Sequence, residues 1–259
     1  MIEVYQFSQT EILTFILVLL RVSVFLVSWP VFGTSYIPGP AKILLGLILA
    51  SLMFPVAGRD RLPIEDLEQF YIWLLVREVF IGLALGFLAR FFFFAISIAA
   101  QIISDSIGLS AIQLLNPTTE DRGSAIEQFY AILATLFFLG LNGHHIFLSG
   151  LAKSYEFLPL TTRGLDLTGL IQVGELSQLV MVIGLKLAAP VFISIFCMNV
   201  AMGIIGRAVP QIHVLVTSMP VNILAGLAVM FASIPLLMTG MGDLLNDTIA
   251  AVFGIMKSL

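Results

Sequence analysis

Charged side chains that lie inside long apolar runs are the residues of this sequence with the greatest capacity for chemistry. They are Arg21, Arg77, Glu78, Arg90 and Lys186. A charge at membrane depth is costly, so it pairs with an opposite charge, snorkels to the surface or lines a polar path. We predict that Arg21 or Arg90 contacts Glu78 or Asp105, either in this chain or in a neighbouring subunit. For Arg21, a position along a polar path is the alternative.

Catalytic signatures are absent from the sequence, which has no GxxxxGK[ST] loop, no HExxH and no GxSxG. The pair His144–His145 follows an apolar run, but adjacent residues on a helix diverge by about 100°, so two neighbouring histidines seldom share one metal ion. We expect a polar helix end there, with a pH-sensitive or ligand-binding role as the alternative. Cys197 is the single cysteine and cannot form an internal disulfide. The sequence therefore predicts no enzyme, no cofactor and no metal site.

The composition is that of a membrane protein. Of the 259 residues, 59% are hydrophobic and 11% are charged, whereas soluble domains average about 25% charged residues. The formal net charge is −4 and no basic run occurs, which argues against nucleic-acid binding. No Lys or Arg precedes Arg21, so the first apolar run lacks the positive start of a secretory signal and is expected to be retained.

Apolar runs of helical length follow one another along the chain. We expect helices at residues 12–32, 41–57, 70–103, 125–141, 176–205 and 212–241, with a short last helix from Asp243 to Lys257. As a helix, the run at 70–103 exceeds about 45 Å, which is longer than the roughly 30 Å hydrocarbon core of a bilayer. Prolines inside the later runs favour kinks. The predicted fold is all-α, with membrane-associated helical hairpins, long kinked helices and a re-entrant central loop.

Small residues and polar stretches indicate how these helices meet. Gly82 and Gly86 follow Glu78 at intervals of four, so all three share one helix face, where glycines let another backbone approach closely. Residues 151–175 form the longest amphiphilic stretch and are expected to be a loop and a boundary. The last part is expected to form a helical hairpin bent at residues 207–211. Across six drawn spans, Lys and Arg divide five to three between the two sides, which is too weak a bias to set the orientation.

A polar island interrupts the apolar runs at residues 104–128, SDSIGLSAIQLLNPTTEDRGSAIEQ. Between its polar clusters lies an apolar strip from Leu109 to Leu115, and the turn-forming sequence NPTTEDRG follows. Irregular backbone is tolerated at membrane depth only where protein or water satisfies its polar groups. We predict a re-entrant or plug-like loop here, and a purely structural connector is the alternative.

Four stretches of the sequence, in order, resemble one protein family. GIIGRAVPQIHVLVTSMPVNILAGLAVM, residues 203–230, closely resembles the signature of the FliR family, the export-gate proteins of the bacterial flagellar type III secretion apparatus. The family's Arg-x-x-Pro-Gln turn and second proline correspond to Arg207, Pro210, Gln211 and Pro220. The earlier stretches are LLRVSVFLVSWPVFG (19–33), REVFIGLALGF (77–87) and DSIGLSAIQLLNP (105–117). His213 is a departure, because many relatives carry Asn at that position.

The resemblance implies a non-enzymatic subunit of a multi-protein gate. Residues 1–170 would correspond to a FliP-like helical part that contains the central plug loop, at about 104–124, and residues 171–259 to a FliQ-like helical hairpin. It further implies assembly with FliP-like and FliQ-like gate subunits and contact with FlhB-like and FlhA-like export proteins. The expected location is the bacterial inner membrane at the flagellar basal body, where unfolded flagellar proteins would pass through the shared channel.

The resemblance also implies that the central loop closes the pore. The apolar residues that would block it are Ile107, Leu109, Ile112, Leu114 and Leu115, and the turn residues that would let the loop move are Asn116, Pro117 and Gly123. Two alternatives stay open. One is a secondary transporter of a small solute, which the intramembrane charges and broken helices favour. The other is the injectisome homologue of the same gate subunit.

Overall fold

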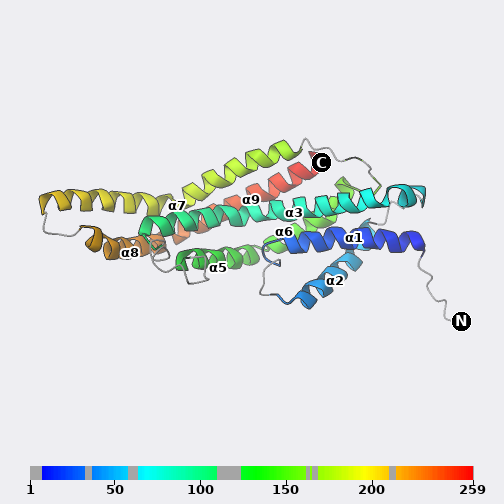
Figure 1. Cartoon of the computed structure of the whole chain (residues 1–259), viewed down its shortest axis with the longest axis horizontal. Helices are drawn as coiled ribbons and strands as arrows, with labels where there is room; N and C mark the ends of the chain where they lie inside the picture. The colour runs from blue at the N-terminus through cyan, green and yellow to red at the C-terminus, as the bar shows by residue number, and fades with distance from the viewer. Residues whose placement is uncertain are drawn as a thin grey trace. The chain divides into compact units, whose positions relative to one another are not determined.

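The computed structural model describes residues 8–32, 37–57, 64–109, 124–161, 164, 169–209 and 214–258. Within these residues the regular structure is helical, which confirms the predicted all-α class (Figure 1). The helices are α1 (Gln9–Ser28), α2 (Gly39–Ala57), α3 (Ile64–Ile107), α5 (Ala125–Gly140), α6 (Gly143–Phe157), α7 (Gly169–Ala208), α8 (Val214–Ala232) and α9 (Ile234–Ser258). Most of the expected re-entrant loop, residues 110–123, lies outside the described part, as does the turn at 210–213.

Four helices are long and apolar enough to cross a membrane: α1, α2, α3 and α7. The number rises to six if the broken pairs α5–α6 and α8–α9 each count as one span. The apolar part of α3, Phe70–Ile107, has 38 residues, so it is about 57 Å long and exceeds a hydrocarbon core of about 30 Å. The apolar part of α7, Val173–Ala208, has 36 residues. The prediction of overlong helices is confirmed.

Local side-chain chemistry explains where several helices begin and end. At the start of α1 the Glu11 carboxylate accepts the Ser8 backbone N–H at 3.0 Å, and at the start of α5 the Ser124 hydroxyl accepts the Glu127 N–H at 3.2 Å. α3 ends at Ile107 and is followed by Gly108, whose φ of +92° is the left-handed conformation that glycine adopts without strain. The Gly108 and Leu109 N–H groups both donate to the Ser104 carbonyl at 3.1 Å. This left-handed turn stops α3 where the polar island begins.

Three predicted boundaries are wrong. The stretch 151–175 is not one loop, because α6 continues to Phe157 and α7 begins at Gly169. The pair His144–His145 does not end a helix but lies in the first turn of α6, after Asn142 in a left-handed conformation (φ 56°). The expected short last helix from Asp243 is part of the longer α9. In each case polar residues within a helix were taken for a boundary.

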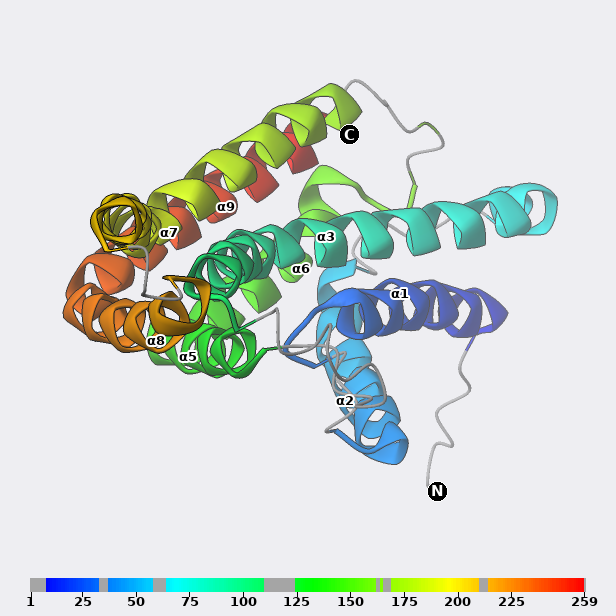
Figure 2. The same ribbon diagram turned by 60° about the vertical axis from the view of Figure 1, so that its left-hand side comes forward.

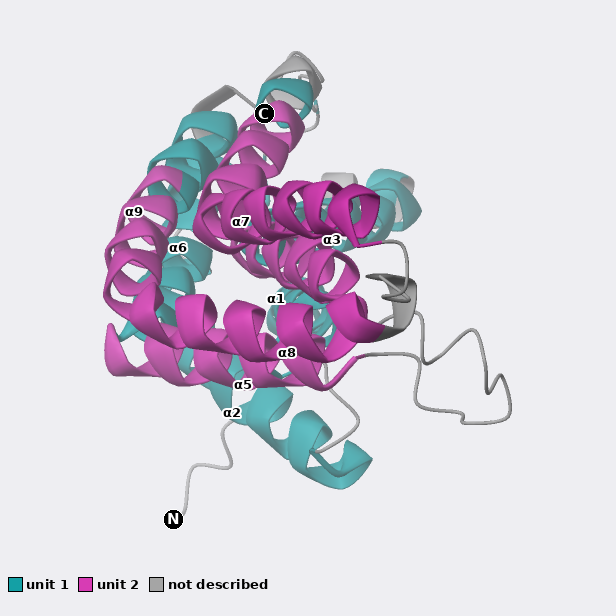
Figure 3. Ribbon diagram, turned by 90° about the vertical axis from the view of Figure 1, so that its left-hand side faces the viewer, with its two compact units in different colours: residues 1–91, 142–175, 248–259 teal, residues 92–141, 176–247 magenta. Residues whose placement is uncertain are grey.

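The chain divides into two compact units (Figure 3). Unit 1 comprises residues 1–91, 142–175 and 248–259, and unit 2 comprises residues 92–141 and 176–247. α3 therefore contributes its first part to unit 1 and its last part to unit 2. The predicted division at residue 170 separates a FliP-like part from a FliQ-like part by family resemblance, not by compact units. It stays a prediction.

In unit 1, α1 packs along the first part of α3 (Figures 1 and 2). Gly82 and Gly86 make this approach close, since a Cβ atom at Gly82 would lie 2.8 Å from the Arg21 carbonyl oxygen and one at Gly86 would overlap the Ser28 side chain. Beyond the end of α1, the fully buried Trp29 ring packs on Phe147 of α6, with ring centroids 6.0 Å apart. The glycine face thus lets α1 and α3 pack closely, and the contact of the Trp29 ring with Phe147 joins α6 to them.

In unit 2, aromatic and small residues join the helices. Phe138 of α5 contacts Phe92 and Phe93 at the middle of α3, with centroids 5.7 and 5.4 Å apart. α5 lies beside α8 (Figure 2), where Phe129 meets Phe231. Three further contacts hold this unit: Gly184 of α7 against Ala95, Gly226 of α8 against Ile107, and the Asn222 amide donating to Asn199 at 2.8 Å. The end of α3 is therefore packed among α5, α7 and α8.

Candidate functional site: a buried charge cluster

The buried charge cluster consists of Arg21, Arg77 and Glu78, all in unit 1 and all with 0% exposure. Arg21 and Glu78 form a two-pronged ion pair: Arg21 Nε donates to Oε2 at 2.5 Å and Nη2 donates to Oε1 at 3.0 Å. Arg77 Nη1 lies 3.5 Å from the same Oε1. Parallel N–H bonds from a guanidinium to a carboxylate are among the stronger and more directional polar contacts. The pair therefore links α1 to α3 in a fixed geometry.

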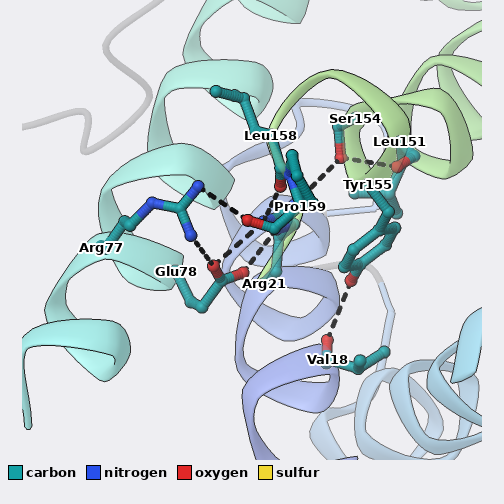
Figure 4. Close-up of polar contacts among 9 residues, drawn as sticks. All are labelled: Val18, Arg21, Arg77, Glu78, Leu151, Ser154, Tyr155, Leu158 and Pro159. Carbon is teal, nitrogen blue, oxygen red and sulfur yellow. Dashed lines mark hydrogen bonds and ion pairs between the residues drawn. The ribbon is translucent and has the colours of Figure 1, made fainter. Parts of the chain in front are cut away.

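Both arginines also bind backbone carbonyls that directly follow the C-terminal end of α6 (Figure 4). Arg21 Nη2 donates to the Leu158 carbonyl at 2.9 Å, and Arg77 Nη2 donates to the Pro159 carbonyl at 3.0 Å. The last carbonyls of a helix have no partner within the helix and carry the negative end of its dipole. Two arginines and one glutamate give the cluster a formal charge of +1. The two carbonyls accept hydrogen bonds from the arginines that carry this excess positive charge. The two arginines of the cluster therefore bind the backbone at the end of α6 as well as the Glu78 carboxylate.

Two further side chains of α6 complete the contacts of Arg21. Its Nη1 donates to the Ser154 hydroxyl at 3.0 Å, and that hydroxyl donates to the Leu151 carbonyl at 2.6 Å. The guanidinium carbon lies 4.2 Å from the centre of the Tyr155 ring, and the Tyr155 hydroxyl donates to the Val18 carbonyl at 3.4 Å. A cation over an aromatic face adds an attraction of about 0.5–2 kcal/mol. α1, α3 and α6 are therefore joined through one guanidinium.

The chemistry of this arrangement is structural. It contains no nucleophile beside a base, and an arginine keeps its proton under all ordinary conditions. Among the residues that the structure describes, no group of three His, Cys, Asp or Glu side chains could hold a metal ion. His144 and His145 have rings with centroids 4.1 Å apart, and His145 is exposed. The cluster acts as a clamp that holds three helices together.

The structure brings only some of the sequence-predicted residues together. Arg90 is separate from the cluster and donates from Nε to the Ser28 carbonyl at 2.5 Å. Ile107 is fully buried and Leu109 is half-buried at the end of α3. The exposed residues of the predicted set are Asp105, Lys186, Arg207 and Pro220. Those outside the described residues are Ile112, Leu114, Leu115, Asn116, Pro117, Gly123, Pro210 and Gln211.

Sequence reasoning did not find the α6 side of the cluster. The available signal is the spacing of Phe147, Leu151, Tyr155 and Leu158, which recur at intervals of four, four and three, the period of a helix face. All four are buried. The carbonyl partners at residues 158 and 159 carry no signature in the side-chain sequence.

Comparison with known proteins decides the family. Residues 12–248 match the family described as bacterial export proteins, family 1. The chain belongs to this family. A flagellar biosynthetic protein FliR of Bacillus subtilis is 30% identical over 213 residues, which cover 81% of each chain. The FliR of Escherichia coli is 28% identical over 219 residues, covering 85% of this chain and 83% of that one. The FliR of Aquifex aeolicus is 25% identical over 248 residues, covering 93% and 92%.

The match of the bacterial export family extends over every helix of the buried charge cluster, because α1, α3 and α6 all lie almost entirely within residues 12–248. The resemblance to the FliR family stated from four short stretches is therefore confirmed over nearly the whole chain.

Proposed function

We propose that this chain is a subunit of the export gate of the bacterial flagellar type III secretion apparatus. The observation that carries the proposal is the family match over residues 12–248, together with relatives named flagellar biosynthetic protein FliR. Those relatives carry a flagellar name, which favours the flagellar gate over the injectisome homologue. The gate is a channel through which unfolded flagellar proteins cross the inner membrane at the basal body, and the chain has no enzymatic step to perform.

The exposed surface supports assembly with other helical subunits. α7 has large apolar side chains that remain exposed on this chain, among them Met181, Leu185, Phe192 and Phe196. The largely apolar stretches of 36 and 38 residues in α7 and α3 also extend beyond a single bilayer core, so part of their surface needs protein rather than lipid as a neighbour. FliP-like and FliQ-like gate subunits are the partners we propose for these faces, with FlhB-like and FlhA-like export proteins in contact with the assembly.

The buried charge cluster argues against the transporter alternative. That alternative depended on charges inside the membrane that would handle a solute or an ion. Arg21, Arg77 and Glu78 instead contact one another and the end of α6, with no exposure. Their role is to hold the housing of the gate together.

Co-purification tests the proposed assembly. The full chain, carrying an affinity tag in its own host, should bring down FliP-like and FliQ-like subunits in mild detergent. A strain that lacks the chain should neither export flagellar proteins nor swim, and the tagged chain should restore both. Recovery of the chain alone as a small homo-oligomer, from cells whose motility and flagellar export do not depend on it, would refute the proposal.

We also propose that the central loop closes the channel. The loop departs at Gly108, directly after Ile107, whose side chain is held against Gly226 of α8. A packed anchor followed by a left-handed glycine is a suitable base for a moving segment. Deleting residues 112–117, the heart of the apolar strip, should raise the ion leak of cells that carry the gate. Unchanged leak with normal export would instead favour a plain connector.

A further inference from the structure

A large apolar pocket lies within unit 1, apart from the buried charge cluster. Its volume is about 780 Å³, which is in the range of small-molecule sites. α1 and α3 form most of its walls, and Val173 at the start of α7 and Ile255 near the end of α9 also line it. The apolar side chains of the walls include Val24, Val27, Phe80, Leu83 and Phe87.

Arg90 is the charged residue that lines this pocket. A guanidinium has five N–H donors, and Arg90 uses Nε for the Ser28 carbonyl. Among the described residues its two terminal nitrogens, with four donors, have no hydrogen-bond or ion-pair partner. Arg90 is half-buried. The pocket therefore combines apolar walls with a cation whose donors are available.

Aligning a bilayer core with α1 puts Arg90 at the level of lipid headgroups. Ser28, which it contacts, is the last residue of α1, and the 20 residues of α1 are about 30 Å long, the thickness of a hydrocarbon core. Arg90 also follows Phe70, where the apolar part of α3 begins, by 20 residues, or about 30 Å. With the core so aligned, both measures put the guanidinium at one edge of the core and the apolar walls of the pocket inside it, while the apolar part of α3 continues beyond this edge to Ile107.

We propose that this pocket binds one anionic phospholipid, with an acyl chain against α1 and α3 and the phosphate on the terminal nitrogens of Arg90. A guanidinium fork matches two phosphate oxygens. A net negative headgroup is favoured over a zwitterionic one because Arg90 is the one charged side chain among the lining residues. An apolar helix of a partner subunit is a poorer occupant, since it would leave those donors unsatisfied. The inference does not depend on the export role.

Lipid binding to the assembled complex tests this site. After detergent exchange has removed native lipid, the complex is titrated with phosphatidylglycerol or phosphatidylcholine of identical chains, and bound lipid is counted by native mass spectrometry. The unchanged protein should prefer phosphatidylglycerol by about tenfold, equivalent to about 1.4 kcal/mol. Arg90→Gln should abolish the preference, and Arg90→Lys should keep part of it. Lys186→Gln, which removes an exposed cation that does not line the pocket, is the matched control and should change nothing.

A second variant keeps the test valid if Arg90→Gln fails to fold. Ala84 lines the pocket, so Ala84→Phe should fill the tail site, leave the Arg90–Ser28 contact in place and reduce binding of both lipids. Three results would overturn the proposal: equal binding of the two lipids by the unchanged protein, displacement of phosphatidylglycerol by inorganic phosphate alone, or efficient crosslinking of a cysteine placed at Leu83 to a helix of a partner subunit.

Discussion

Replacing Glu78 by Gln removes the only carboxylate of the buried charge cluster and keeps its shape. The formal charge rises from +1 to +2, and both arginine side chains have 0% exposure. A neutral polar contact between membrane helices is worth about 0.6–1.7 kcal/mol, whereas removing one partner of a buried ion pair costs about 3–5 kcal/mol. The larger figure applies, because two cations lose their counter-charge and the carbonyls at residues 158 and 159 are already bonded.

Thermal unfolding of the purified chain in mild detergent measures this loss. At roughly 2–4 °C per kcal/mol for a chain of this size, Glu78→Gln should lower Tm by about 6–20 °C. Fluorescence-detected size exclusion after heating gives the fraction that remains folded. Glu156→Gln is the matched control: this carboxylate on α6 is exposed, so its removal should change stability by less than about 0.5 kcal/mol.

A second substitution separates charge imbalance from lost contacts. Adding Arg21→Met to Glu78→Gln returns the formal charge to +1 but also removes the bonds to Ser154 and Leu158. If the unbalanced charge dominates, the double variant is more stable than Glu78→Gln alone. A double variant less stable than the single one, or a Glu78→Gln protein with unchanged Tm, would refute the reasoning.

Three further predictions concern packing and helix ends. Gly86→Ala should cost about 1–3 kcal/mol, because the new Cβ overlaps α1; Gly203→Ala, with no atom within 4 Å, should not destabilise, and the same thermal assay compares them. Ser124→Ala removes the acceptor at the start of α5 and should cost about 1 kcal/mol, seen as faster amide exchange in its first turn. Asn199→Leu leaves the Asn222 amide without its partner and should lower stability by about 0.6–1.7 kcal/mol, and the added Asn222→Leu should recover most of the loss.

The contact between α1 and α3 is the part of the site that the sequence predicts best. Gly82 and Gly86 follow Glu78 on one face, and a charge inside an apolar run needs a partner, so Arg21 opposite Glu78 was among the expected pairs. The structure contains this pair. Hydropathy alone also predicts most helices, because a run of apolar residues at membrane depth has no other way to satisfy its backbone.

The part contributed by α6 could not be predicted in the same way. Lys153 and Glu156 gave this stretch the polarity of a loop, although both are exposed on the outer side of a helix whose other face is buried. The bonds from Arg21 and Arg77 go to backbone carbonyls, which every residue has, so no side-chain pattern marks them. The volume of the apolar pocket depends on how α1, α3, α7 and α9 pack against one another. The pattern of apolar residues in a single sequence does not predict that packing.

The hydrogen-bond partners of Arg21 are synthesised at different times. Glu78 follows it by 57 residues, but Ser154 and the Leu158 carbonyl follow by 133 and 137. At roughly 5–20 residues per second, a ribosome needs about 7–27 s to cover that interval. During this interval Arg21 in α1 lacks some of its hydrogen-bond partners. An arginine in a membrane helix costs about 2.5–3.5 kcal/mol to insert, which the apolar residues of α1 must offset. Since residues 248–259 also belong to unit 1, this unit closes only after these residues have been synthesised, and a chain truncated before residue 248 would expose the defect to quality-control proteases.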